Sequence, residues 1–285
     1  MPTPSVRPLE PRDIDAVHHV MTAAFQDLNV RMGEPPEPAG PIEHARIRVA
    51  RCLATDPGGS WVAERDGETV GCALAIVREG VWGLSLLIVS PDAQSGGTGR
   101  ELLARAFEYG NGARGWIVLA SRDPRALRSY SRLGLDLHPA VAARGRVRSI
   151  EAPPEVRPGT RDDLPLTEAA DRAARGAAHG EDILAMLAVG SDLLVLPERG
   201  YVLVREGNVR QLAAFDDEAA ATLLRAALAS AAGNEASVEW MTSAQNWAIR
   251  ACLDAGLDLK TDIGGVFLGG DVGPFRPYLP SGAYL

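Results

Sequence analysis

The sequence predicts an α/β protein built from two tandem copies of one fold. Helix and strand patterns alternate along residues 1–149, and the same plan restarts in residues 150–285. Residues 156–164, VRPGTRDDL, echo residues 6–14, VRPLEPRDI, and the linker EAPPE at 151–155 separates the copies. A length of 285 residues also fits about two domains. We therefore predict domains at 1–149 and 150–285.

In the first half, apolar runs predict strands, and apolar residues at helical spacing predict helices. Ile14, Val17, Val20 and Met21 recur on one helix face after the opening Pro11. The dipeptide DG at 66–67 is a typical hairpin turn. The predicted strands are 6–9, 60–64, 69–77, 81–89 and 116–120. The predicted helices open at Pro11 and cover 42–54, 100–109 and 123–133, with Gly134 as the last cap, and residues 31–41 read as a loop.

The second half repeats this succession more loosely. Its predicted strands are 193–196, 201–205, 209–213 and 238–241, and its predicted helices are 217–232 and a segment that ends at Ala255 before Gly256. The tail 268–285 is rich in Gly and Pro and carries several aromatic residues. We expect this tail to pack on its own domain.

Composition points to an ordinary globular protein. The chain is 46% hydrophobic and 23% charged, no apolar run approaches a membrane span, and no secretory signal opens the sequence. Three scattered cysteines predict neither a disulfide framework nor a zinc site, so we expect a cytoplasmic protein. The net charge of −8 argues against general nucleic-acid binding. It mildly suits a cationic acceptor such as an amine, but acidity that only aids solubility is the better explanation.

The most informative segment is QSGGTG at 94–99. It lies between an apolar run, 84–89, and a helical pattern that begins at Arg100. A strand, a glycine-rich turn and a helix start bring several backbone N–H groups around one point, where the helix dipole also attracts an anion. Glycines let a ligand approach the backbone closely. The segment therefore predicts a phosphate site, with an ordinary glycine-rich turn as the alternative.

The residues around this turn select among phosphate motifs. No lysine follows the glycines, which excludes a P-loop, and Leu102 stands where the dinucleotide motif needs its third glycine. The string VSPDAQSGGTG at 89–99 instead resembles the acetyl-CoA motif of GNAT-type N-acetyltransferases, [QR]-x-x-G-x-[GA]. Gln94, Gly97 and Gly99 match that motif in order.

This resemblance implies two tandem GNAT folds, each a mixed, mostly antiparallel sheet flanked by helices. The implied order of the first is β-α-α-β-β-β-α-β-α-β-β. Acetyl-CoA is the implied cosubstrate, with its pantetheine arm along the strand at Leu87 and Val89 and an oxyanion donor near the Leu87 N–H. The implied contacts of its phosphates are Gln94, Gly96, Gly97, Thr98, Gly99 and Arg100.

The same resemblance makes Tyr130 the candidate general acid. In GNAT proteins a tyrosine four residues after an alanine often protonates the departing thiolate, and Ala126 and Tyr130 have this spacing. A core tyrosine on an amphipathic helix is the structural alternative. An asparagine that commonly contacts CoA is replaced here by Asp123, which we expect to be the helix N-cap with Pro124 at the first helical position. That CoA contact is therefore in doubt.

No general base is visible in the sequence. The strand 81–89 carries no carboxylate, so a base would act through water or come from Glu34, Glu43 or His44, each of which also reads as a surface residue. A terminal carboxylate of the tail is a further hypothesis, because the tail approaches the first site in some tandem GNAT proteins. The histidines show no metal-ligand spacing, so we predict no metal.

The second half lacks the residues of the first site. Phe215 to Ala219 replace the phosphate turn with three carboxylates, and Cys252 stands opposite Tyr130 when the helices are aligned on Gly134 and Gly256. We therefore expect a degenerate second domain and one acetyl-CoA per chain. The predicted function is acetyl transfer to a primary amine of a small molecule or peptide. The alternative is a non-catalytic acyl-CoA binder or sensor. The sequence leaves open the acceptor, the acyl length and the oligomeric state.

Overall fold

The computed structural model describes residues 4–35 and 38–285, which fall into two compact units. Unit 1 comprises Met1–Val77 and Trp82–Ala113, and unit 2 comprises Arg78–Val81 and Arg114–Leu285. The start of the chain and part of the predicted loop 31–41 lie outside the described residues. The predicted domain boundary after residue 149 stays a prediction about the two copies of the fold.

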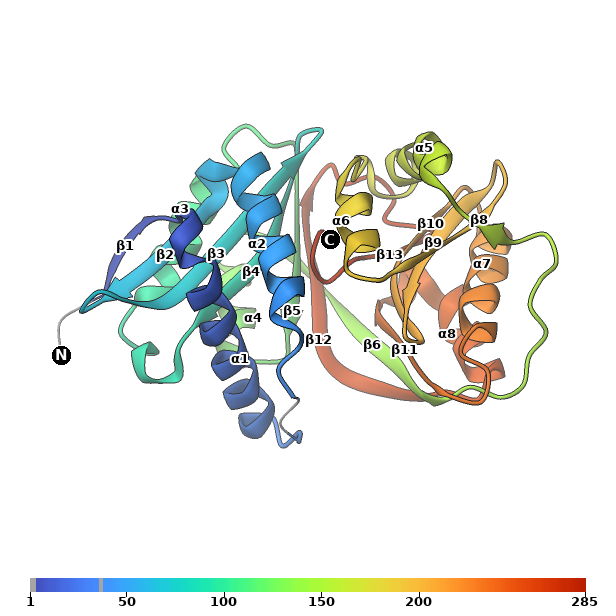
Figure 1. Ribbon diagram of the computed structural model, residues 1–285, viewed down its shortest axis with the longest axis horizontal. Helices are drawn as coiled ribbons and strands as arrows, with labels where there is room; N and C mark the ends of the chain where they lie inside the picture. The colour runs from blue at the N-terminus through green and yellow to red at the C-terminus, as the bar shows by residue number, and fades with distance from the viewer. Residues whose placement is uncertain (1–3, 36–37) are drawn as a thin grey trace. The chain divides into compact units, whose positions relative to one another are not determined.

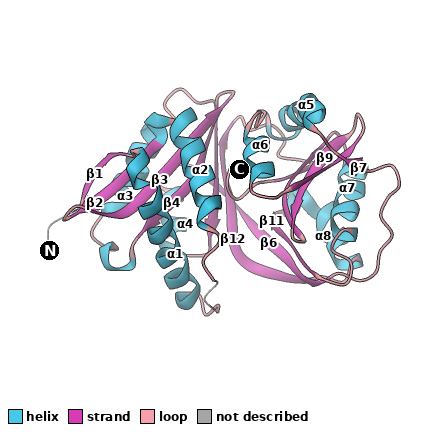
Figure 2. Ribbon diagram, viewed as in Figure 1, coloured by secondary structure: helices cyan, strands magenta, loops and turns pink. Residues whose placement is uncertain are grey.

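Unit 1 is a sheet with helices packed along it (Figures 1 and 2). Its strands follow the order β1-β2-β3-β4, and β1–β2 and β2–β3 are antiparallel. Helices α1 and α2 pack side by side, and α3 packs against β2. The strands are β1 (Ser5–Pro8), β2 (Ser60–Arg65), β3 (Glu68–Arg78) and β4 (Val81–Val89), and the helices are α1 (Ile14–Arg31), α2 (Ile42–Thr55) and α3 (Thr98–Glu108).

Unit 2 contains the end of the first sequence half and the whole second half. Its strand order is β5-β12-β6-β11-β10-β9-β8-β7, and β13 pairs with β10. The strands are β5 (Gly115–Ser121), β6 (Asp136–Arg146), β7 (Arg157–Pro158), β8 (Asp192–Leu196), β9 (Gly200–Arg205), β10 (Asn208–Ala214), β11 (Glu235–Met241), β12 (Asp258–Gly270) and β13 (Tyr278–Leu279). The helices are α4 (Pro124–Ser131), α5 (Leu164–Arg175), α6 (Asp182–Ala188), α7 (Asp217–Ala229) and α8 (Asn246–Asp254).

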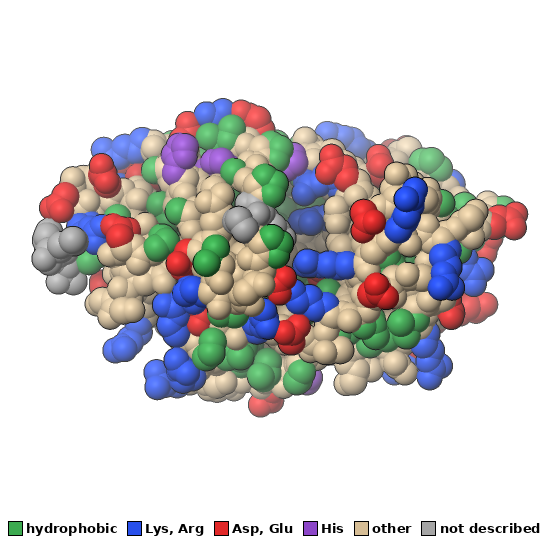
Figure 3. All heavy atoms as spheres, turned by 90° about the horizontal axis from the view of Figure 1, so that it is seen from below, with side chains coloured by type: hydrophobic (Ala, Val, Ile, Leu, Met, Phe, Trp, Pro, Cys, Tyr) green, Lys and Arg blue, Asp and Glu red, His purple; other side chains and the backbone are tan. Residues whose placement is uncertain are grey.

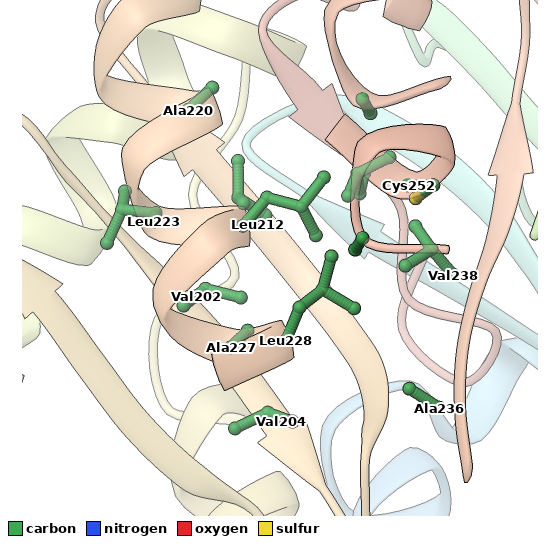
Figure 4. Packing of buried hydrophobic residues seen from close by; sticks show 14 of the residues in the cluster. Val202, Val204, Leu212, Ala220, Leu223, Ala227, Leu228, Ala236, Val238 and Cys252 are labelled. Carbon is green, nitrogen blue, oxygen red and sulfur yellow. The ribbon is translucent and has the colours of Figure 1, made fainter. Parts of the chain in front are cut away.

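Helices α5 and α7 cover opposite faces of β9 and β10. Side chains alternate between the faces of a strand. Tyr201 points to α5, where its hydroxyl donates to Asp171, whereas Val202 belongs to the apolar cluster that includes Leu223 of α7. Figure 4 shows this cluster, in which Cys252 of α8 packs with side chains of β10 and β11. The core of the second half therefore lies on the α7 side.

The similar segments 6–14 and 156–164, at the starts of the two sequence halves, form the same local structure. Arg7 makes two hydrogen bonds to the carboxylate of Asp13, at 2.7 and 2.8 Å, and Arg157 makes the same pair to Asp163, at 3.0 and 2.7 Å. In each case the carboxylate also accepts a backbone N–H at the start of the following helical segment. The repeat predicted from the sequence thus uses the same arginine fork twice, once in each unit.

The strand β12 comes from the second half but lies between two strands of the first half. It pairs antiparallel with β5 on one side and with β6 on the other, while β6 also pairs with β11. Gly264 is needed for this insertion, because its φ is 122° and a Cβ there would clash with the carbonyl oxygen of Ala120. The described chain has one strand, β6, between α4 and the linker. The final strand that the resemblance implied for the first half is therefore supplied by β12.

Charged residues of both signs are interspersed on the face drawn in Figure 3. Surface ion pairs occur in each unit, for example Arg46–Asp15 at 2.8 Å and Arg199–Asp216 at 2.7 Å. Pairs of this kind contribute little to stability, because solvent screens them. The fold therefore depends on its apolar cores and its strand pairing.

The close packing around β12 predicts that one methyl group added at Gly264 destabilises the protein. Gly264→Ala should lower the free energy of unfolding by about 2–6 kcal/mol, because overpacking and an unfavourable backbone conformation each cost about 1–3 kcal/mol. Gly233→Ala is the matched control, since Gly233 also has a positive φ, 78°, but a Cβ there meets no atom within 4 Å. Chemical denaturation of both variants measures the difference, and equal losses would contradict the close packing around β12.

Candidate functional site

The glycine-rich turn lies between β4 and α3 of unit 1, as the sequence predicts. After Val89 the chain forms a short 3₁₀ turn, Pro91–Ala93, and α3 begins at Thr98. Ser95 and Gly97 take φ values of 68° and 93°, so two left-handed residues reverse the chain before the helix. Gly97 is the N-cap of α3 and, being glycine, supplies no side chain to cap it. The start of this helix is therefore left open.

The open helix start leaves backbone donors available. The carbonyl of Gly97 accepts the N–H groups of Arg100 and Glu101, at 2.9 and 3.1 Å. Among the described residues, no hydrogen bond engages the N–H groups of residues 95–99. Most backbone donors in folded proteins are paired, so five consecutive unpaired ones at a helix N-terminus form a typical anion site.

The side chain of Thr98 adds a second, independent sign of a ligand. Thr98 is 5% exposed, and its hydroxyl oxygen has no hydrogen-bond partner among the described residues. Burying a hydroxyl without a partner costs free energy. Next to it, Cβ atoms added to Gly96 or Gly97 would meet no atom within 4 Å. The turn thus combines open space, free N–H groups and an unpaired hydroxyl, a combination that fits a phosphate.

The remaining predicted cofactor residues surround this turn. The side-chain amide of Gln94 donates to the carbonyl oxygen of Val89 at 3.0 Å and so ties the turn to the end of β4. Leu87 and Val89 are half-buried on one face of β4, whereas Leu86 and Ile88 are buried. The alternation keeps one face of the strand accessible near the turn. Gln94 therefore positions the turn in addition to any contact with a ligand.

Arg100 contributes a positive charge to the turn. It lies in the first turn of α3, is exposed, and forms no ion pair with another described residue. A cation at a helix N-terminus opposes the helix dipole, so its position is unfavourable for the helix alone. An anion bound at the turn would offset that cost.

Tyr130 lies on α4 of unit 2. Its ring is buried, with 6% of the residue exposed, and packs edge-on against Phe267 at 5.6 Å between ring centroids. The hydroxyl forms no hydrogen bond with another described residue. Burial raises the pKa of Tyr130 above its ordinary value, and the charge of Asp123 raises it further. The hydroxyl therefore keeps its proton throughout the physiological pH range.

The structure confirms the predicted role of Asp123. Its carboxylate accepts the N–H of Arg125 at 2.8 Å as the N-cap of α4, and Pro124 is the first helical residue. The guanidinium of Arg125 also binds this carboxylate at 2.8 Å. The helix ends at Ser131, three residues before Gly134, which has a φ of 79° in the following turn. Asp123 is thus committed to the helix start.

The candidate bases stay predictions. Glu43 pairs with Arg46 at 2.5 Å on the surface of α2, an interaction that favours its role as a surface residue. Glu34 and His44 both take part in interactions within the described chain. Sequence reasoning missed Ser85, a buried residue in the middle of β4 whose hydroxyl accepts a hydrogen bond from Arg48 at 3.1 Å. No local pattern links these two residues, because α2 and β4 meet only in the folded unit.

The corresponding helix start in the second half is closed. Asp216 is the N-cap of α7, and its carboxylate accepts the N–H of Ala219 at 2.8 Å. Arg199 binds both Asp216 and Glu218, at 2.7 and 3.2 Å. Cys252 is buried in the apolar core, and burial raises the pKa of its thiol to about 12. A carboxylate here takes the place that a phosphate needs.

The described residues lack the features of a metal site and of a membrane-spanning helix. They contain no group of three or more His, Cys, Asp or Glu side chains that could hold a metal ion. Within the same residues no helix has the length and apolar character that a bilayer crossing requires.

Comparison with known proteins shows what the chain and its fold are similar to. Residues 21–135 match the model of the acetyltransferase (GNAT) family. The fold is similar to that of a proposed acetyltransferase from Pyrococcus horikoshii, with 18% identity and a TM-score of 0.80 over 99% of this chain and 96% of that one. A GCN5-related N-acetyltransferase from Sphaerobacter thermophilus gives 17% identity and a TM-score of 0.61 over 99% of both chains.

A tandem GNAT protein from the clavulanic acid biosynthesis pathway is also similar, with 13% identity and a TM-score of 0.56 over 95% of this chain and 99% of that one. No curated protein matches the sequence. These similarities confirm the predicted fold class of two tandem GNAT folds. Residues 21–135 are thus similar to the acetyltransferase (GNAT) family, and over its length the chain has the fold of a tandem GNAT protein.

Proposed function

We propose that this protein transfers an acetyl group from acetyl-CoA to a primary amine, using the residues of its first half. The observation that carries the proposal is the open turn at 95–99. Its N–H groups are unpaired among the described residues, space is open beside Gly96 and Gly97, and the buried Thr98 hydroxyl lacks a partner there. A pyrophosphate supplies the oxygens that these donors need. The N-termini of other helices, such as α4 and α7, are instead capped by carboxylates.

In this proposal the turn holds the phosphates of CoA, and the accessible face of β4 holds its pantetheine arm. Gly96, Gly97 and Gly99 leave room for the phosphate oxygens, Thr98 donates its hydroxyl, and Arg100 contributes positive charge. The backbone near Leu87 polarises the thioester carbonyl. Preorganised donors at the site of developing charge are effective because they need not reorient during the reaction.

The amine attacks the thioester carbonyl carbon, the carbon–sulfur bond breaks, and CoA leaves as a thiolate. We propose that Tyr130 donates the proton that the thiolate takes up. The hydroxyl is protonated at neutral pH, as a proton donor must be, and its raised pKa makes it a weaker acid than an ordinary tyrosine. The ammonium proton of the acceptor goes to water or to a base on the acceptor side. The acidic chain, with a net charge of −8, suits a cationic acceptor.

The second candidate function is a non-catalytic acyl-CoA binder, favoured by the absence of a carboxylate in β4. Release of free CoA thiol from acetyl-CoA, measured over a panel of primary amines, separates the two. Amine-dependent thiol release supports the transferase. Tight acetyl-CoA binding with no release above background over the panel supports the binder.

Thr98→Val tests the phosphate site. The hydroxyl has no partner among the described residues, so its removal should leave the free energy of unfolding unchanged or higher. A hydrogen bond to a charged group is worth about 1.5–3 kcal/mol, so affinity for acetyl-CoA should fall about 10–100-fold. Calorimetric titration and chemical denaturation measure the two quantities.

The control for Thr98→Val is Thr167→Val on α5. Thr167 is also a buried threonine, but its hydroxyl donates to the carbonyl of Leu164 at 2.8 Å. This variant should lose stability and keep its acetyl-CoA affinity. A Thr98→Val protein that binds acetyl-CoA as tightly as the wild type would remove the phosphate assignment.

Tyr130→Phe tests the proton donor. It removes one hydroxyl that has no hydrogen-bond partner in the described part of the chain, so folding and acetyl-CoA affinity should change little. If Tyr130 protonates the thiolate, kcat should fall about 100-fold or more. Steady-state kinetics with an active amine measure the loss, and an unchanged kcat would leave Tyr130 as a core residue.

A further inference from the structure

The tail of the chain lies against the second-half counterpart of β4. This counterpart is β10, because β10 leads into α7 as β4 leads into α3. The strand β13 pairs antiparallel with β10, joining Leu279 to Leu212 and Tyr278 to Ala213. The N–H of Ala214 donates to the carbonyl of Pro277 at 3.3 Å and extends this pairing. The tail thus adds a strand to the hydrogen-bonding edge of β10.

The neighbouring strands leave room for this addition. β10 and β11 are parallel and pair only at Asn208 and Ser237, at the start of both strands. Farther along, β13 contacts both β10 and β11. A separation between these strands is thus filled by main chain of the same molecule, which satisfies backbone groups that would otherwise stay unpaired.

Two contacts fix the beginning of the tail. The side-chain amide of Gln245 donates to the carbonyl of Phe275 at 2.8 Å, and Arg276 forms an ion pair with Asp217 at the start of α7. Phe275 has a φ of 50°. A bulky residue holds such a conformation only where its surroundings fix it. The tail therefore follows a defined path past the capped start of α7 into the separation between β10 and β11.

The far end of the tail is held in a buried polar pocket. The main-chain oxygen of Leu285 accepts hydrogen bonds from His179 Nε2 at 2.7 Å and from the Tyr278 hydroxyl at 2.6 Å. Leu285 is 1% exposed and has a φ of 67°. Its N–H donates to the carbonyl of Ser281 at 2.7 Å. Leu285 is thus enclosed, and its N–H and this main-chain oxygen are both hydrogen-bonded.

The receptor behind this end comes from other elements. The second ring nitrogen of His179 lies 2.8 Å from Asp171 Oδ2 on α5, and Asp171 Oδ1 accepts the hydroxyl of Tyr201 on β9 at 2.6 Å. The amide of Gln211 on β10 also contacts the His179 ring, at 2.8 Å. All four side chains are fully buried. Buried polar groups are costly unless they are hydrogen-bonded. This network therefore favours a ligand that completes its hydrogen bonds.

We propose that the second half has turned the cleft of its GNAT fold into a receptor for an extended peptide, and that its ligand is the chain's own segment 275–285. Strand pairing along β10 supplies affinity, and the Asp171–His179 pair recognises the main-chain oxygen at the far end. The same cleft cannot also hold a pantetheine arm. Wild-type protein should therefore bind acetyl-CoA only in its first half, with one equivalent per chain.

Hydrogen exchange of the full-length chain tests the receptor. In the wild type, amides in 278–285 should exchange slowly. The double variant Arg276→Glu/Tyr278→Phe replaces an ion pair by repulsion from Asp217 and removes one hydrogen bond to Leu285. Losses of this size open the tail at least about 10-fold more often, so exchange should accelerate by that factor in 278–285 and not in β9 or α7.

Tyr201→Phe is the matched control, because it removes a buried tyrosine hydroxyl of the same network that binds Asp171 and not the tail. It should leave the exchange of 278–285 slow. A labelled synthetic peptide of residues 275–285 should bind the double variant saturably and the wild type not at all, and a scrambled peptide should bind neither. This second measurement stands even if the variant loses some stability.

Several results would contradict the proposal that the second half is a receptor for segment 275–285. They are rapid exchange of 278–285 in the wild type, equal peptide binding by wild type and variant, and two equivalents of acetyl-CoA per wild-type chain. Acceleration of tail exchange by saturating acetyl-CoA would also overturn it, because the tail would then be a displaceable cover over a CoA site. A chain that binds no acetyl-CoA but keeps a protected tail would refute the proposed function and leave the receptor intact.

Discussion

The insertion of β12 between β5 and β6 is the constraint on which unit 2 depends. These pairings join the last strand of the second sequence half to strands of the first half, and β6 in turn pairs with β11. Gly264 and Gly265 permit it, because a Cβ at either position would collide with the backbone of a neighbouring strand. The two copies of the fold share their final strands, so neither copy completes its sheet alone.

The two copies use the same structural position in opposite ways. The helix α3 begins at a glycine and leaves its N–H groups unpaired, whereas α7 begins at Asp216, whose carboxylate caps it. We expect the first start to attract an anion from solution, whereas the second is already capped by a carboxylate of the chain. This difference is the reason why we propose a phosphate site in the first half and none in the second.

A similar contrast holds for the adjoining strands. β4 keeps the side chains of Leu87 and Val89 partly accessible, while β10 pairs with β13 along one edge. A cleft without a ligand exposes apolar surface and unpaired backbone groups, which lowers stability. A second half that does not bind CoA therefore gains from filling its cleft, and the tail does so with paired backbone and a buried end.

The sequence by itself determined the local features. The turn at 94–99, the strand Val81–Val89, the cap at Asp123 and the arginine forks of Arg7 and Arg157 follow from contacts within a few residues or from one repeated pattern. Only the tertiary structure decided the insertion of β12 between β5 and β6 and the hydrogen-bond network of Asp171, His179, Tyr201 and Leu285. Their partners lie far apart in the chain, and no spacing rule connects them. Hydrogen-bond pairing across long separations is settled by packing and burial, which a local pattern does not encode.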